Sequence, residues 1–176
     1  MSKNPIRPPL LPREEFDDVL NMLAIPLGMK LQLITQRVAL RPADLTLQQW
    51  RFMLCLARNG DLHLRRLTRM AALDPAHASR AATQLVKRGF VSARKNPDDN
   101  RQRVFSLTPG GRDMVRAVWP RSKAPSMEIR GLYTDAEFAL FKEFMARAIS
   151  HAEEILDAPA PVRGADTLPC DADDAA

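Results

Sequence analysis

The chain of 176 residues is long enough for one domain with a helical extension, and its net charge of +5 alone does not identify a nucleic-acid partner. The distribution of that charge is more informative. Residues 58–112 hold twelve basic and four acidic side chains, so this segment carries more positive charge than the whole chain. Such a concentration indicates a surface that binds a polyanion.

The composition also excludes several classes of protein. Cys55 and Cys170 have neither the spacing of a zinc site nor that of a disulfide framework. The sequence contains no apolar run of membrane-spanning length and no apolar signal region, because four prolines interrupt residues 1–13. We therefore expect a cytoplasmic protein without a metal, a cofactor or a membrane partner.

The first elements along the chain are a proline-rich arm over residues 1–14 and a helix from Glu14 to about Leu40. Pro26 is expected to kink this helix or to start a second segment. The next helix begins with a capping box, Thr46 to Gln49, and ends at Asn59-Gly60.

Two short helices follow, Leu64–Ala72 and Pro75–Arg88, and only two residues separate them. Asp74 is suited to cap the second helix, whose first position is a proline. Two strands, Val91–Arg94 and Arg103–Leu107, are then expected on either side of a polar turn.

The rest of the folded chain is predicted to be helical. One helix begins at Thr108-Pro109, breaks or bends at Trp119-Pro120 and resumes after Pro125. The last helix opens with a second capping box, Thr134 to Glu137. Residues 158–176 form an acidic tail that we expect to be disordered.

Two short helices with a tight junction and a basic hairpin after them fit duplex DNA, with the second helix in the major groove. Ala78, Ala82, Leu85 and Val86 are expected to pack inward. The opposite face offers arginine for guanine edges, glutamine for adenine, and hydroxyl and lysine groups for phosphates. The candidate contacts on this face are His77, Ser79, Arg80, Thr83, Gln84 and Lys87.

The hairpin is expected to concentrate positive charge, because Arg94, Lys95, Arg101 and Arg103 surround its turn. Their mutual repulsion is costly without an anionic partner, and nearby aspartates compensate only in part. An arginine at such a tip can insert into the minor groove, where narrow A·T tracts concentrate negative potential.

The run from Asp99 to Arg112, with Asp-x-Arg, an apolar strand and Leu-Thr-x-x-Gly-Arg, resembles the wing signature of MarR-type regulators. The resemblance implies a winged helix-turn-helix domain over residues 46–111, and a helical dimerisation region formed by residues 15–45 and 112–157. It also implies that Arg101 enters the minor groove and that Asp99 orients it. A homodimer would then bind a pseudo-palindromic operator in double-stranded DNA, most commonly as a repressor.

Members of that family commonly respond to small aromatic acids or phenols that bind between the dimerisation and winged domains. The walls of such a site in this chain are expected to come from Met29, Leu33, Arg37, Trp50, Arg51, Leu54 and Met114. Some relatives sense oxidants through a cysteine, which leaves oxidant sensing by Cys55 as an alternative. Cys55 lies in an apolar helix, where a thiol is more often an inert core residue.

Two other classes of function are open. An enzyme is disfavoured, because the sequence has no phosphate-binding glycine loop, no nucleophile elbow and no cluster of metal ligands. A winged-helix adaptor that binds protein instead of DNA has no need of the basic hairpin. Steep salt dependence of binding distinguishes the DNA-binding regulator from this adaptor.

Overall fold

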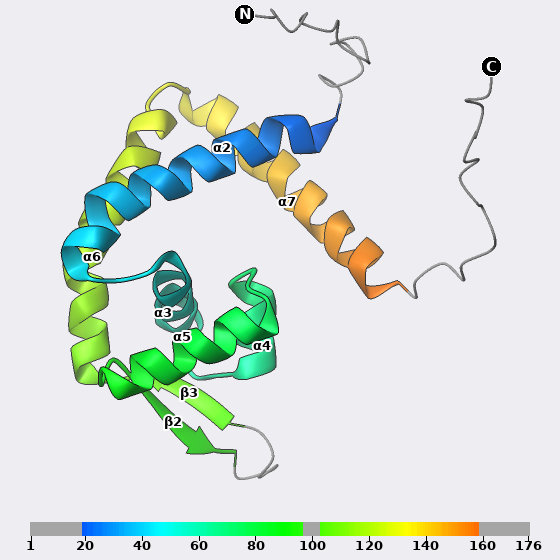
Figure 1. The fold of residues 1–176 in the computed structure, drawn as a ribbon. Helices are drawn as coiled ribbons and strands as arrows, with labels where there is room; N and C mark the ends of the chain where they lie inside the picture. Colours follow the sequence, from blue (N-terminus) through cyan, green and yellow to red (C-terminus); the bar gives the residue numbers. More distant parts are fainter. Residues whose placement is uncertain (1–18, 97–102, 159–176) are drawn as a thin grey trace, which may run out of the picture. The chain divides into compact units, whose positions relative to one another are not determined.

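The structure is a computed structural model that describes residues 19–96 and 103–158, and it is mainly helical with a small antiparallel sheet (Figure 1). The elements follow the chain in the order α2 (Leu20–Thr35), η1 (Gln36–Leu40), η2 (Arg41–Ala43), α3 (Leu47–Asn59), β1 (Leu62–His63), α4 (Leu64–Met70), α5 (Pro75–Lys87), β2 (Val91–Lys95), β3 (Arg103–Leu107), α6 (Pro109–Arg130) and α7 (Asp135–Asp157). The chain divides into two compact units, Met1–Ile129 and Arg130–Ala176. This architecture confirms the predicted fold class.

The core of the first unit joins α3, α4, α5 and the sheet. Phe52 and Met53 of α3 are fully buried together with Leu67 of α4 and Leu85 of α5. The ring of Phe105 on β3 meets the Phe52 ring edge to face, with 5.6 Å between the ring centroids. Helix α5 and the hairpin therefore share one core with α3, which fixes their relative positions.

The sheet has the strand order β1-β3-β2, and all its pairs are antiparallel. The hairpin register pairs Val91 with Leu107 and Lys95 with Arg103, so the predicted strands are confirmed. Strand β1 was not predicted, because two residues immediately before a helix are too few to show the alternation of a strand.

Both predicted capping boxes are present. The Thr46 hydroxyl accepts from the Gln49 backbone N–H at 3.2 Å, and the Gln49 side chain accepts from the Thr46 backbone N–H at 2.9 Å. Thr134 and Glu137 repeat this reciprocal pair at the start of α7. The two hydrogen bonds that Thr134 donates lower the pKa of the Glu137 carboxyl.

Helix α6 is continuous through Pro120 and Pro125, so of the predicted break or bend at Trp119-Pro120 the break is wrong. A proline removes one backbone hydrogen bond, which a helix can lose when its other bonds are kept. Helix α2 likewise continues through Pro26, but it ends at Thr35 and a π-helical turn covers residues 36–40. The predicted start of that helix at Glu14 lies outside the described residues.

Helices α2 and α7 contain no buried residue, although both are rich in apolar side chains. Leu33 on α2 is 63% exposed and Phe144 on α7 is 53% exposed. Within the described ranges, no helix is both long enough and apolar enough to cross a membrane. Each helix thus leaves a large apolar surface uncovered in the single chain.

A threonine hydroxyl ties the end of α5 to the start of α6. Thr108 donates to the Gly89 carbonyl at 2.6 Å and accepts from the Gly111 backbone N–H at 3.0 Å. A Cβ on Gly111 would overlap the carbonyl oxygen of Phe90, so only glycine allows α6 to begin this close to the chain that leaves α5. The Leu-Thr-x-x-Gly-Arg motif therefore has a structural role, which is to lock this junction.

We predict that Gly111→Ala lowers the free energy of unfolding by about 1 to 3 kcal/mol, because backbone must move to admit the methyl group. Urea unfolding followed by circular dichroism measures this loss. Gly110→Ala is the matched control, since the nearest atom to its Cβ is the Thr108 hydroxyl at 3.9 Å. Equal stability of the two variants would contradict the proposed role of the close approach.

Candidate nucleic-acid interface

Helix α5 has a well-defined start. The Asp74 carboxylate accepts from the His77 backbone N–H at 2.9 Å, and Pro75 occupies the first helical position. This backbone hydrogen bond, followed by the one from the His77 ring, lowers the pKa of Asp74. Gly89, with φ of 72°, then turns the chain out of the helix toward β2.

The two faces of α5 differ sharply. Ala78, Ala81, Ala82 and Leu85 are buried against the core. The prediction that Val86 packs inward is wrong, because Val86 is exposed and Ala81 lies on the buried face instead. The structure brings all six predicted contact residues of this helix together on its exposed side, namely His77, Ser79, Arg80, Thr83, Gln84 and Lys87.

These six residues differ in whether their side chains already contact other groups of the protein. The His77 ring contacts the Asp74 carboxylate, and the Thr83 hydroxyl donates to the Ser79 carbonyl at 3.0 Å. Arg80 and Lys87 have no ion-pair partner among the residues that the structure describes. The cations of α5 are therefore available to an external anion.

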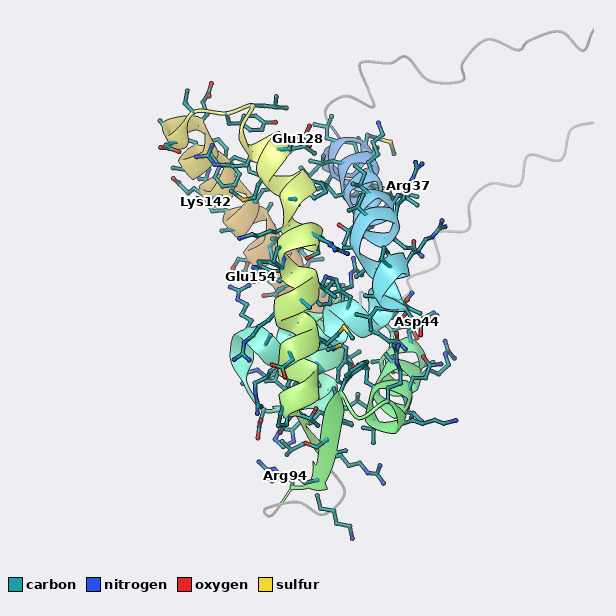
Figure 2. The ribbon with its side chains drawn as sticks, turned by 90° about the vertical axis from the view of Figure 1, so that its left-hand side faces the viewer. Arg37, Asp44, Arg94, Glu128, Lys142 and Glu154 are labelled. Carbon is teal, nitrogen blue, oxygen red and sulfur yellow. The ribbon has the colours of Figure 1, made fainter. Side chains whose placement is uncertain are left out.

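Arg94 lies at the end of β2 that is far from α6, as Figure 2 shows. Its guanidinium contacts the Asp61 carboxylate at 3.2 Å. A hydrogen bond from Ser106 and the nearby Arg94 guanidinium hold the pKa of Asp61 below its ordinary value. Both groups of this pair are about half exposed, so a phosphate can compete with Asp61 for the arginine.

Lys95 and Arg103 lie directly opposite each other in the hairpin, and both are exposed. Like charges at opposite positions of an antiparallel pair are destabilising. Neither side chain has an ion-pair partner within residues 19–96 and 103–158. This end of the hairpin therefore favours a bound anion. The predicted contacts Asp99 and Arg101 lie outside the described residues.

A cavity of about 520 Å³ lies between α3, α4 and α6. It is lined by Leu54, Cys55, Ala57, Arg58, Asn59, Met70, Val115 and Trp119. Its lining is mostly apolar, with the Arg58 guanidinium as its cationic group. A second cavity of about 380 Å³ lies beside it and shares Ala57 and Val115. No sequence signal revealed the first cavity, because its lining residues come from three helices that are far apart along the chain.

The structure does not gather the seven predicted effector residues around one site. Leu54 lines the larger cavity. Met29, Leu33 and Arg37 are exposed on α2 and η1, and Trp50 is buried in the core. Met114 packs partly buried against that core, and Arg51 donates to the Ala72 carbonyl at 3.5 Å.

Cys55 lines the same cavity and is partly buried. Burial raises the pKa of its thiol, although Arg58 and Arg51 act in the opposite direction. A raised pKa leaves little thiolate at neutral pH, and the thiolate is the form that reacts. The described residues contain no cluster of potential metal ligands.

Comparison with known proteins finds similar transcription regulators. The model of the MarR family matches residues 45–102. The chain is 33% identical over 87 residues to the HTH-type transcriptional regulator FarR of Neisseria gonorrhoeae, covering 49% of this chain and 60% of FarR. It is 30% identical over 78 residues to the uncharacterised HTH-type regulator YhbI of Bacillus subtilis, covering 44% and 51%. The chain thus spans only about half to three fifths of these relatives.

Solved structures match over a greater length. The regulator NadR is 25% identical, with a TM-score of 0.67 over 74% of this chain and 92% of NadR. A MarR-family regulator from Silicibacter pomeroyi has a TM-score of 0.71 at 18% identity, over 77% of this chain and 91% of its own. The winged helix-turn-helix geometry, the family model over residues 45–102 and these likenesses agree, and the chain shares the fold of MarR-family regulators.

Proposed function

We propose that this protein is a DNA-binding transcription regulator that reads a pseudo-palindromic operator as a homodimer. The observation that carries the proposal is the positive charge at the end of the hairpin, where Lys95 faces Arg103 and neither has an ion-pair partner among the described residues. Such a pair costs stability in the free protein and gains a partner on the phosphate backbone. The proposal includes no enzymatic activity.

Helix α5 is the element that we propose enters the major groove. One side of α5 packs against the core. The exposed side carries Arg80 and Lys87, and neither forms an ion pair with a carboxylate among the described residues. A major groove about 12 Å wide admits one helix with its side chains. The hairpin cations Arg94, Lys95 and Arg103 then contact backbone phosphates, and Arg101 with Asp99 extends toward the minor groove as the family resemblance implies.

A second copy of the chain is the proposed cover for α2 and α7. Their exposed apolar side chains include Leu23, Leu33, Phe141, Phe144 and Ile149. Apolar surface of this extent is unusual on a monomer and is typical of an obligate interface. Two copies related by a twofold axis present two α5 helices to two half-sites, which is why a palindromic operator is expected.

We predict that Arg80→Ala weakens operator binding by about 1 to 3 kcal/mol, because one groove or phosphate contact is lost. Fluorescence anisotropy against a selected operator at several salt concentrations measures the loss. Wild-type affinity should fall steeply with salt, since each neutralised phosphate releases counterions. Arg101→Ala, made in the same way, tests the residue at the proposed tip.

Arg121→Ala is the matched control for these measurements. Arg121 is an exposed arginine on α6, outside the basic segment, and its loss is expected to leave affinity unchanged. A flat salt response of the wild type would favour an adaptor that binds protein. Equal affinity of Arg80→Ala and the wild type would reject α5 as the contacting helix.

The effector that we propose is a single-ring aromatic acid or phenol, bound in the cavity between α3, α4 and α6. The cavity volume lies within the range of small-molecule sites, and Trp119 and Met70 supply an apolar wall beside the Arg58 guanidinium. NadR, which shares the fold at 25% identity, was solved with 4-hydroxyphenylacetate. That ligand combines the ring, the hydroxyl and the carboxylate that this lining suits.

Release from DNA follows from where the cavity lies. Met70 is the last residue of α4, and only the short junction 71–74 separates it from α5. A ligand wedged between Met70 and α6 shifts α4 and, through it, the helix in the groove. We therefore propose repression that the effector relieves. Oxidant sensing by Cys55 is the weaker alternative, since burial raises its pKa.

We predict that 4-hydroxyphenylacetate slows alkylation of Cys55, because an occupied cavity covers the thiol. The measurement uses the Cys170→Ser variant, so that Cys55 is the only thiol in the chain. Mass spectrometry follows its reaction with N-ethylmaleimide at several ligand concentrations. 4-Methylphenol is the matched control, since it lacks the carboxylate for Arg58 and should protect less. Operator release by the acid with no protection of Cys55 would place the effector elsewhere.

A further inference from the structure

Two glutamine side chains connect the start of α3 to the exposed face of α5. The Nε2 of Gln49 donates to the Oε1 of Gln84 at 2.8 Å. Gln49 is only 4% exposed, whereas Gln84 is exposed on the flank of the face that carries Arg80. A buried amide therefore holds a side chain that belongs to the proposed DNA-reading surface.

The orientation of both amides is set by a backbone group. The Thr46 N–H can only donate, so the Gln49 oxygen must point to it, and the distance between them is 2.9 Å. The nitrogen of Gln49 then points to Gln84, whose oxygen must accept. The Nε2 group of Gln84 is left as the end that faces away from α3.

The opposite orientation is unfavourable at each link. Turning the Gln49 amide over would place its nitrogen against the Thr46 N–H, two donors with no acceptor between them. Turning the Gln84 amide alone would oppose two donors in the same way. Because Gln49 is buried, water cannot relieve either mismatch, and buried groups without partners are costly.

We propose that Gln84 presents its amide nitrogen to a hydrogen-bond acceptor on a base edge, which makes it favour guanine or thymine over cytosine. The proposal rests on the proposed function, because α5 must lie in the major groove for Gln84 to meet a base. A glutamine that recognises adenine uses its oxygen and nitrogen together. In this protein that oxygen already accepts from Gln49, which leaves it one lone pair and fixes the direction of the amide.

The major-groove pattern decides which bases suit a donor. Guanine presents two acceptors, N7 and O6, and thymine presents O4. Cytosine presents only its N4 donor, which opposes the Gln84 nitrogen, whereas adenine presents the acceptor N7 beside its N6 donor. Gln49 is then a positioning residue that acts on specificity through Gln84 without touching DNA.

The test is selection of the full-length protein and its variants on randomised duplexes, with sequencing of the bound fraction. Gln84→Glu keeps the shape of the side chain and its bond from Gln49, but presents an oxygen to the groove. We expect the preference at one position of each half-site to shift from guanine or thymine toward cytosine, by roughly tenfold in relative affinity. Preferences at the other positions should stay unchanged.

Gln49→Glu is also expected to present an oxygen to the groove, but it leaves Gln84 itself unaltered. Its carboxylate still accepts from Thr46, as glutamate does in a capping box, but it has no proton to donate. Gln84 must then turn its amide to donate to the new carboxylate, so its oxygen faces the groove. Gln49→Met removes the partner altogether, and we expect it to flatten the discrimination at that position.

These outcomes separate the inference from the function on which it rests. Circular dichroism verifies the fold of the Gln49 variants, and Gln84→Glu changes an exposed residue that does not pack in the core. A shift at one shared position in both glutamate variants supports the inference. Unchanged preferences in Gln84→Glu, with binding retained, overturn it and leave the proposed function standing. A wild type that enriches no sequence overturns both.

Discussion

The two hydrogen bonds of the Thr108 hydroxyl fix where the hairpin lies relative to α5. One bond reaches the Gly89 carbonyl at the exit of α5 and the other the Gly111 N–H at the entry of α6. Strands β2 and β3 run between these two points, so both ends of the hairpin are anchored at one place. A surface built from a helix and a hairpin can match the spacing of DNA grooves only if the angle between the two is constant. The Thr108 junction holds the angle between α5 and the hairpin constant.

The same anchoring permits the opposite end of the hairpin to be unfavourable on its own. Lys95 and Arg103 repel each other where the strands are farthest from the core, and Arg94 relies on an exposed Asp61. The core pair Phe52 and Phe105 stabilises the near end of the same strands. The stabilising contacts thus lie at the base of the hairpin and the excess positive charge at its end. This arrangement is typical of a binding site in which the ligand reduces an unfavourable repulsion.

The parts of the fold that the sequence predicted well depend on local chemistry. Both capping boxes, the Asp74 cap and the strand pairing over residues 91–107 follow from residues within a few positions of each other. The failures have non-local causes. Pro120 was expected to break or bend α6, yet the helix is not broken there. The cavity is lined by residues of α3, α4 and α6, and no residue spacing along the chain predicts that these three helices meet there.

Gln49 shows why chemistry at a reading surface is hard to derive from residue types alone. In the sequence it is the last residue of a capping box, and that role is confirmed. Its remaining amide protons point to a residue 35 positions away, and that contact decides which end of Gln84 is exposed. The residue type alone therefore does not decide how a glutamine on α5 would meet a base, because the hydrogen bond from Gln49 turns the Gln84 oxygen toward α3. Under the proposed function, base specificity depends on a hydrogen bond that originates in the cap of another helix.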